Sequence, residues 1–272
     1  MRKRVLRAVA GVILAVTMVS GASRAGQLIT FDVPSKQASP LRLLGYLARP
    51  TGLGPFPAVV LLHGCGGFAG DVVAWADKVS HWGYVALAVD SFGPRGVQSA
   101  CDAPFPDQPI DGYRALSFLA RQPFVRTDRV AVMGFSLGGT AALTDMERGL
   151  IGDLYPAKFH AGIAFYPFCG SASGVMAAPT LILIGELDDW TPAAACREMV
   201  EGRSDIGVTR KPGDRTMVKL VVYPGAHHAF DVPGPLFAHG VRLHGHWLEY
   251  NEAATKDSIE RVKVFLQRTL GD

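Results

Sequence analysis

The feature that most constrains the fold is a short apolar run that ends in a serine between glycines. The segment reads Val-Ala-Val-Met-Gly-Phe-Ser-Leu-Gly-Gly from Val130 to Gly139, and small, helix-forming residues follow it. This order predicts a strand, a sharp Gly-x-Ser-x-Gly turn and a helix, with Ser136 at the apex. Such a turn strains the serine backbone and lifts its hydroxyl above the sheet. The pattern favours a nucleophilic serine over a glycine-rich turn with an incidental serine.

The neighbours of the serine have separate roles in this interpretation. Side chains at Gly134 and Gly138 would collide across the turn, which explains the two glycines. Leu137 begins the helix, so its N–H faces negative charge that develops beside Ser136. A serine hydroxyl is a poor nucleophile at neutral pH and needs a histidine base, which in turn needs an orienting acid. The turn therefore predicts an Asp or Glu and then a His, each in a loop after a later strand.

The N-terminus has the pattern of a secretory signal peptide. Residues 2–7 are mostly basic, residues 8–19 are largely apolar, and small residues lead to Ala25. The apolar run is shorter than the roughly 20 residues that span a bilayer, so we expect cleavage near Ala25. The mature protein would then be periplasmic or secreted, without stable membrane association. The alternative is an uncleaved membrane anchor.

The charge balance argues against a nucleic-acid partner. The formal net charge is +3, but residues 1–25 hold five basic residues and no acidic ones, so their removal leaves a net charge near −2. No later segment is a run of Lys and Arg. The basic character therefore belongs to the targeting segment, and we expect no nucleic-acid binding.

Four cysteines favour two disulfide bonds in an exported protein. They are Cys65, Cys101, Cys169 and Cys196, and four cysteines allow three pairings. The coarse layout favours Cys65–Cys101 and Cys169–Cys196, because each pair would link loops at the same end of neighbouring strands. Four free, buried thiols are the alternative. No pair has the spacing of a zinc site, so no structural metal is expected.

Hydrophobic periodicity predicts an α/β domain over residues 26–272. Buried or alternating runs predict strands at 28–33, 41–48, 58–62, 84–89, 130–133, 161–166, 180–184 and 217–222. Helices are predicted at 71–82, 110–120, 138–148, 191–201 and 252–270. Alternating strands and helices imply a mostly parallel sheet that helices cover on both faces. The chemistry is then expected at the carboxyl ends of the strands.

The two loops that the serine requires are both present. A buried strand runs into Gly-Glu-Leu-Asp-Asp-Trp-Thr-Pro at 185–192, and a later strand runs into Tyr-Pro-Gly-Ala-His-His-Ala-Phe at 223–230. The order serine, acid, histidine is the one that this kind of turn predicts. Because adjacent loop residues point in different directions, the residues alone do not choose between the two aspartates or the two histidines.

Three signatures together resemble the dienelactone hydrolase family of α/β-hydrolases. They are the serine turn, Gly-x-x-Asp-x-x-x-Pro at Gly185–Pro192, and Ala-x-His-x-Phe at Ala226–Phe230. The resemblance covers essentially all of the chain after the signal peptide. It implies the α/β-hydrolase fold, with about eight mostly parallel strands, helices on both faces and no large cap domain. It also implies a triad of Ser136, Asp188 and His228.

The resemblance leaves other roles for the neighbouring residues and implies a class of reaction. Asp189 would cap the following helix, and His227 would be an exposed loop histidine. The namesakes of the family carry cysteine at the turn, whereas serine members resemble general esterases. The implied activity is hydrolysis of a small ester or lactone through an acyl-serine, without a cofactor. A serine peptidase of the same fold and a non-catalytic binding protein on this scaffold are the rivals.

Further residues are expected around the serine. Oxyanion donors would be the N–H groups of Leu137 and Cys65, the latter in a His-Gly-Cys-Gly-Gly loop after an early strand. Arg95 would bind a substrate carboxylate, as an arginine in a similar loop does in the family, or brace its own loop through an ion pair. Phe92 and Trp190 would line a substrate pocket or pack in the core.

Five of the eight histidines lie between positions 227 and 246. A metal site is conceivable there, but the His-Gly-His spacing suits no helical ligand pair and the flanks are rich in glycine. We therefore expect a glycine-rich loop and no metal. The sequence leaves the natural substrate and the oligomeric state open.

Overall fold

The computed structural model describes residues 24–32, 42–103, 107–149, 151–203 and 216–271. Most of the expected signal peptide and the connection between the strands expected at 28–33 and 41–48 lie outside the described residues. None of the helices in the described part of the chain is long and apolar enough to cross a membrane.

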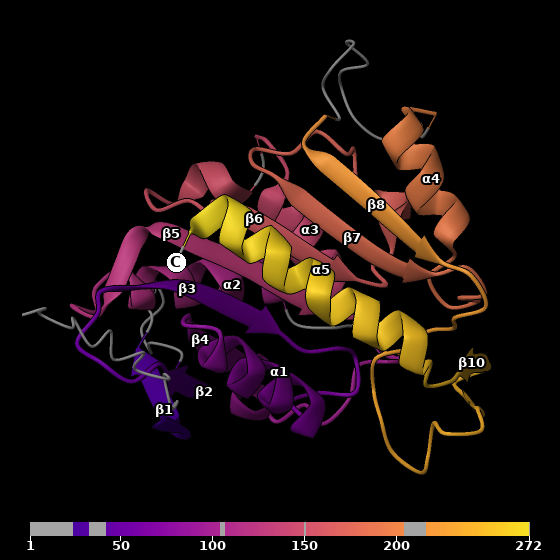
Figure 1. Cartoon of the computed structure of the whole chain (residues 1–272), viewed down its shortest axis with the longest axis horizontal. Coiled ribbons are helices and arrows are strands. Elements are labelled where there is room, and N and C mark those ends of the chain that lie inside the picture. Colours follow the sequence, from indigo (N-terminus) through magenta and orange to yellow (C-terminus); the bar gives the residue numbers. More distant parts are fainter. Residues whose placement is uncertain (1–23, 33–41, 104–106, 150, 204–215, 272) are drawn as a thin grey trace, which may run out of the picture.

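One central sheet organises the chain, as predicted (Figure 1). Its strands follow the order β1-β2-β4-β3-β5-β6-β7-β8, and every pairing from β4 to β8 is parallel. The antiparallel pairings lie at one edge, where β1 pairs with β2 and β2 pairs with β4. The strands are β1 (Arg24–Asp32), β2 (Arg42–Arg49), β3 (Phe56–Leu62), β4 (Val85–Asp90), β5 (Val125–Phe135), β6 (Ala161–Phe165), β7 (Thr180–Gly185) and β8 (Val218–Tyr223).

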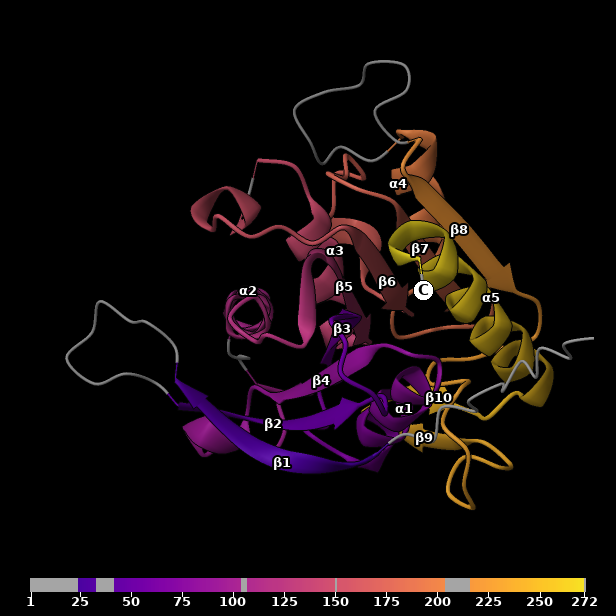
Figure 2. The same ribbon diagram turned by 60° about the vertical axis from the view of Figure 1, so that its left-hand side comes forward.

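Helices cover both faces of the sheet, which explains why its inner strands are continuous apolar runs. Figures 1 and 2 show α1 (Gly70–His81) and α5 (Glu252–Leu270) on one face. The other face carries α2 (Gln108–Leu119) and α3 (Leu137–Met146), while α4 (Ala193–Glu201) packs against β8 at the far edge. Single 3-10 turns lie at η1 (Gly93–Arg95), η2 (Ile151–Leu154) and η3 (Cys169–Ser171).

The parallel arrangement brings distant loops to one edge of the sheet. Ser136, Asp188 and His228 follow β5, β7 and β8, and all three strands end at that edge. The connection from β6 to β7 contains only η3, so no cap domain is inserted there. The edge is covered instead by a small hairpin, β9 (Val241–Leu243) and β10 (His246–Leu248), which the sequence analysis did not predict.

Several boundaries differ from the expected ones for local reasons. The last turn of α3 ends at Met146 rather than at Arg148, because Glu147 adopts extended backbone angles. Helix α4 begins at Ala193 rather than at Thr191, since Pro192 is extended with ψ of 131°. Strand β5 begins earlier than expected, at Val125, where it joins β3 through an irregular register.

Both expected disulfide bonds are present. Cys65 and Cys101 are joined with a Cα–Cα distance of 4.8 Å, and Cys169 and Cys196 with one of 4.9 Å. The first bond ties the loop after β3 to the loop after β4, and the second ties η3 to α4. The first bond therefore links two loops beside the candidate site, whereas the second links a 3-10 turn to a helix, because Cys196 lies within α4.

Candidate active site

Ser136 lies at the apex of a strained turn between β5 and α3. Its φ is +52° with ψ of −114°. Residues other than glycine rarely adopt this backbone conformation, which costs about 1–3 kcal/mol. A Cβ on Gly134 would lie 1.9 Å from the carbonyl oxygen of Gly138, and one on Gly138 would lie 2.2 Å from that of Leu62. Backbone atoms thus leave room only for hydrogen at both positions, which is why the turn carries glycine on each side of the serine.

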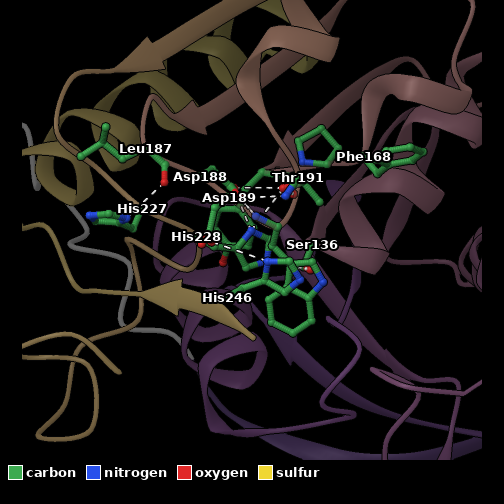
Figure 3. Close-up of polar contacts among 12 residues, drawn as sticks. Ser136, Phe168, Leu187, Asp188, Asp189, Thr191, His227, His228 and His246 are labelled. Carbon is green, nitrogen blue, oxygen red and sulfur yellow. Dashed lines mark hydrogen bonds and ion pairs between the residues drawn. The ribbon is translucent and has the colours of Figure 1, made fainter. Parts of the chain in front are cut away.

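Ser136, His228 and Asp188 form a continuous chain of hydrogen bonds (Figure 3). The Oγ of Ser136 lies 2.9 Å from Nε2 of His228, and Nδ1 of His228 lies 2.8 Å from Oδ2 of Asp188. His228 and Asp188 are 2% and 4% exposed, so water does not compete for the bond between them. Serine, histidine and carboxylate in this order have the arrangement of a Ser-His-Asp triad.

The carboxylate of Asp188 is held by the start of the next segment. Its Oδ1 accepts hydrogen bonds from the backbone N–H groups of Trp190 at 3.0 Å and Thr191 at 2.8 Å. The hydroxyl of Thr191 lies 2.9 Å from Oδ2. These donors fix the carboxylate in one orientation and leave Oδ2 facing the histidine.

The neighbouring aspartate and histidine point elsewhere. Oδ1 of Asp189 accepts the N–H of Trp247 at 3.0 Å and lies 3.6 Å from Nδ1 of His246, so it holds the β9–β10 hairpin and does not cap α4. Figure 3 shows His227 directed away from Ser136. Its Nδ1 lies 3.1 Å from the carbonyl oxygen of Leu187. Only one residue of each pair therefore belongs to the hydrogen-bonded chain that ends at the serine.

Gly185 explains why the acid and histidine loops approach so closely. A Cβ at this position would lie 2.3 Å from the carbonyl oxygen of Ala226. The same carbonyl accepts the N–H of Leu187 at 2.9 Å. The glycine of Gly-x-x-Asp thus lets the two loops pack backbone to backbone, which sets the distance between their side chains.

The loop that contains Cys65 lies against the serine. The Cβ position of Gly64 is 3.6 Å from Cβ of Ser136, and both Cys65 and Leu137 line the space next to the serine hydroxyl. The Cys65 carbonyl accepts the N–H of Ala100 at 2.8 Å, beside the disulfide to Cys101. The loop is therefore attached to the segment after β4 by a covalent bond and a hydrogen bond.

Buried His63 anchors the base of this loop. The N–H of Ser91 donates to its Nε2 at 3.2 Å, so the ring proton is on Nδ1, which donates to the carbonyl of Gly64 at 2.8 Å. Burial lowers the pKa of His63, although nearby carboxylates oppose the shift. A neutral ring with both nitrogens engaged is suited to holding a loop and not to proton transfer.

Two cavities adjoin the serine. One has a volume of about 400 Å³ and lies on the side of His228; the other, about 500 Å³, lies on the side of Leu137. Both share Ser136, the Cys65–Cys101 disulfide and Trp190. The first cavity is mainly apolar, with walls from Phe135, Tyr166, Ala229, Val232, Phe237, Leu243 and Leu248.

The β9–β10 hairpin forms one wall of the first cavity. Its turn residues, His244 and Gly245, both have positive φ, as the tight turn of a two-residue hairpin requires. Nδ1 of His244 lies 2.5 Å from a carboxylate oxygen of Asp102, and the ring of His246 stacks on Trp190 with centroids 4.9 Å apart. The histidines at 244 and 246 thus hold the hairpin over the site.

Among the described residues, no group of His, Cys, Asp and Glu could hold a metal ion.

A buried network below His228 was not foreseen from the sequence. The ring of Tyr166 packs 4.6 Å from that of His228, and its hydroxyl donates to Asp231 at 2.7 Å. Trp75, on α1, donates from Nε1 to the other carboxylate oxygen at 2.8 Å. Burial raises the pKa of Asp231 to about 6, and the two donors only partly offset it. The network thus connects α1 to Tyr166, whose ring packs against that of His228.

This raised pKa predicts a pH-dependent stability. Asp231 binds its proton more tightly in the folded state, where its pKa is about 6, than in the unfolded chain, where it is 3.8. Its contribution to the free energy of unfolding is therefore full below pH 4 and falls by about 3 kcal/mol as the pH rises through 6. Urea unfolding gives the difference in free energy of unfolding between wild type and Asp231→Asn. This difference should change by about 3 kcal/mol between pH 4 and pH 7. A difference that stays constant from pH 4 to pH 7 would contradict it.

The remaining expected residues lie in different surroundings. Arg95 makes a two-pronged ion pair with buried Asp111, at 2.7 and 2.9 Å, and donates to the carbonyl of Ser91. This contact corresponds to the loop-bracing alternative. Phe92 is 1% exposed and packs edge-on against His63, so it supports the loop from below and lines neither cavity. Trp190 lines both cavities.

Comparison with known proteins finds relatives in sequence and in structure. A Bradyrhizobium protein described as a 2-oxo-3-(5-oxofuran-2-ylidene)propanoate lactonase is 28% identical over 206 residues, which cover 69% of this chain and 78% of the relative. A dienelactone hydrolase from Anabaena variabilis has a similar structure, with a TM-score of 0.61 and 19% identity over 91% of this chain and 100% of that one.

A dienelactone hydrolase-like promiscuous phosphotriesterase from metagenomic libraries is also similar, with a TM-score of 0.64 and 20% identity over 91% of this chain and 100% of that one. Likeness at this level of identity shows the shared fold. The sequence profile of the dienelactone hydrolase family matches residues 43–270, which include the serine turn, the acid loop and the histidine loop. The chain therefore belongs to the dienelactone hydrolase family.

Proposed function

We propose that this protein is an exported serine hydrolase that cleaves carboxylic ester or lactone bonds through an acyl-serine intermediate. One observation carries the proposal. The hydroxyl of Ser136, held at the apex of a strained turn, lies 2.9 Å from His228, which lies 2.8 Å from Asp188. The serine also borders an apolar cavity, where a substrate can be held away from water.

The first half of the reaction forms the acyl-enzyme. Oγ of Ser136 attacks the carbonyl carbon, and Nε2 of His228 takes its proton while Asp188 stabilises the charged ring. The N–H groups of Leu137 and Cys65 donate to the developing oxyanion, where one such donor is worth about 10²–10³ in kcat. The ester C–O bond then breaks, and the leaving oxygen takes the proton from His228.

The second half releases the acid. Water attacks the acyl carbon, and His228 accepts one of its protons. The bond to Ser136 breaks, the serine oxygen regains a proton from His228, and the carboxylic acid leaves. No step requires an oxidant, a reductant or a second substrate besides water.

Other observations support the substrate class and the export. Family membership and the lactonase description of the Bradyrhizobium relative favour an ester or lactone as substrate. Export is supported by the basic and apolar pattern of residues 1–25 and by two disulfide bonds, which persist in oxidising compartments. The lack of an inserted domain between β6 and β7 favours an esterase over a peptidase.

Covalent labelling tests the proposal directly. Folded protein treated with a fluorophosphonate should gain one adduct, and peptide mapping should place it on Ser136. Ser136→Ala should stay unlabelled with an unchanged circular dichroism spectrum. The labelled protein should lose hydrolysis of simple esters such as phenyl acetate. Absence of both labelling and ester turnover would overturn the proposal, and cleavage of peptide anilides in preference to esters would assign a peptidase.

A further inference from the structure

The charged groups around the serine are unevenly distributed. Among the described residues that line either cavity there is no lysine or arginine. The cation considered for a substrate carboxylate, Arg95, is held by two hydrogen bonds to Asp111, which also pairs with Arg114. The surroundings of the serine therefore offer no described side-chain cation to an anionic substrate.

The apolar cavity instead has an acidic residue in its lining, Asp71. This residue lies in the first turn of α1 and lines the cavity together with Ser136 and His228. Burial is the main reason for the raised pKa values of Asp231 and Tyr166, and the negative charge of Asp71 raises both further. The negative charge of Asp71 therefore acts on buried groups beside the cavity. It makes no hydrogen bond or ion pair to another described residue.

Other carboxylates near the serine have partners of their own. Asp188 is bound to His228, and Asp102 lies 2.5 Å from Nδ1 of His244 on the hairpin. Asp231 accepts hydrogen bonds from a tyrosine and a tryptophan. Asp71 thus differs from them, because its charge acts on whatever occupies the cavity.

We propose that the site selects uncharged, apolar esters or lactones over those that carry a carboxylate, and that Asp71 determines this selectivity. The inference rests on the proposed hydrolase function. A substrate carboxylate that enters the cavity loses hydration, meets no cation among the described lining residues and faces a like charge. An uncharged apolar group instead gains contact with the phenylalanine and leucine walls.

The apolar walls add a quantitative expectation. Burial of one CH₂ group in an apolar site is worth about fourfold in kcat/KM, when the transfer free energy is converted with RT. Activity on uncharged esters should therefore rise by about this factor with each added CH₂ until the cavity of about 400 Å³ is filled.

Pairs of nearly isosteric esters test the selectivity. Methyl butyrate and monomethyl succinate differ by a carboxylate on the acyl side, and phenyl acetate and 4-acetoxybenzoate differ by one on the alcohol side. In a pH-stat at pH 7 and low salt, wild type should prefer the neutral member of at least one pair by about tenfold or more. Asp71→Asn should narrow that preference by about tenfold, and added salt should narrow it in wild type.

The control variant is Glu198→Gln, which removes one negative charge from the exposed surface of α4, away from both cavities. It should leave the preference unchanged, whereas a general effect of net charge would alter it. Fluorophosphonate labelling verifies that each variant is folded and competent. Equal turnover of neutral and anionic esters by wild type would overturn this inference alone. So would a preference that Asp71→Asn leaves unchanged. Turnover of none of the four esters by wild type that is still labelled would also overturn this inference alone. Absence of both turnover and labelling would overturn the proposed hydrolase function as well.

Discussion

Replacing Asp188 with asparagine should lower kcat for ester hydrolysis by about 10⁴-fold while KM changes little. In the native site Oδ2 of Asp188 accepts the proton on Nδ1 of His228 at 2.8 Å, so Nε2 is free to accept the proton of Ser136. Oδ1 accepts the two backbone N–H groups that follow, and an asparagine would keep its oxygen there. Its amide N–H₂ would then face Nδ1 and favour the ring tautomer that cannot act as base.

Asp189→Asn is the matched control, because it changes the adjacent carboxylate and keeps an oxygen for the N–H of Trp247. It should alter kcat by no more than about threefold, since it weakens only a half-exposed contact to the hairpin. Steady-state kinetics on a neutral ester, normalised by fluorophosphonate titration of competent sites, separates the two variants. A larger loss in Asp189→Asn than in Asp188→Asn would show that the acid is assigned to the wrong residue.

The parts of the structure that could be predicted from the sequence are those that nearby residues determine. The buried strands are continuous apolar runs, and the three site residues each follow such a strand, so a parallel sheet brings their loops to one edge. The choice between adjacent loop residues was beyond local reasoning. Asp188 and His228 differ from Asp189 and His227 in the direction of their side chains, which depends on the packing of two loops that are distant in the sequence.

Features that depend on distant partners were missed or left open. Arg95 was assigned two roles because nothing near it in the sequence reveals that Asp111, on the next helix, would hold it. Asp231 meets Trp75 across 156 residues, and no spacing rule connects them. The β9–β10 hairpin did carry a local signal, since apolar residues at 241, 243 and 248 flank a His-Gly turn. Within the cluster of histidines, His228 contacts Ser136, whereas His244 and His246 hold the hairpin.

Gly134→Ala should destabilise the protein by at least about 3 kcal/mol. The added Cβ would lie 1.9 Å from the carbonyl oxygen of Gly138 and 2.2 Å from its carbonyl carbon. Both contacts are backbone, so no side-chain rotation relieves them, and the start of α3 must move away from β5. Gly138 itself packs closely against the backbone of Leu62, so α3 cannot move toward Leu62 to relieve the clash. The shift would also displace the N–H of Leu137 from the oxyanion.

Gly70→Ala serves as the control for the removal of a glycine. A Cβ at Gly70 meets nothing within 4 Å, and alanine is favoured over glycine in a helix, so stability should stay equal or rise by up to about 1 kcal/mol. Urea unfolding followed by circular dichroism measures both variants. At a temperature where Gly134→Ala is still folded, kcat should be lower by about 10²–10³, because one oxyanion donor is misplaced. Wild-type stability together with wild-type kcat in Gly134→Ala would mean that the turn can relax. The strained backbone of Ser136 would then not depend on the close packing of β5 and α3.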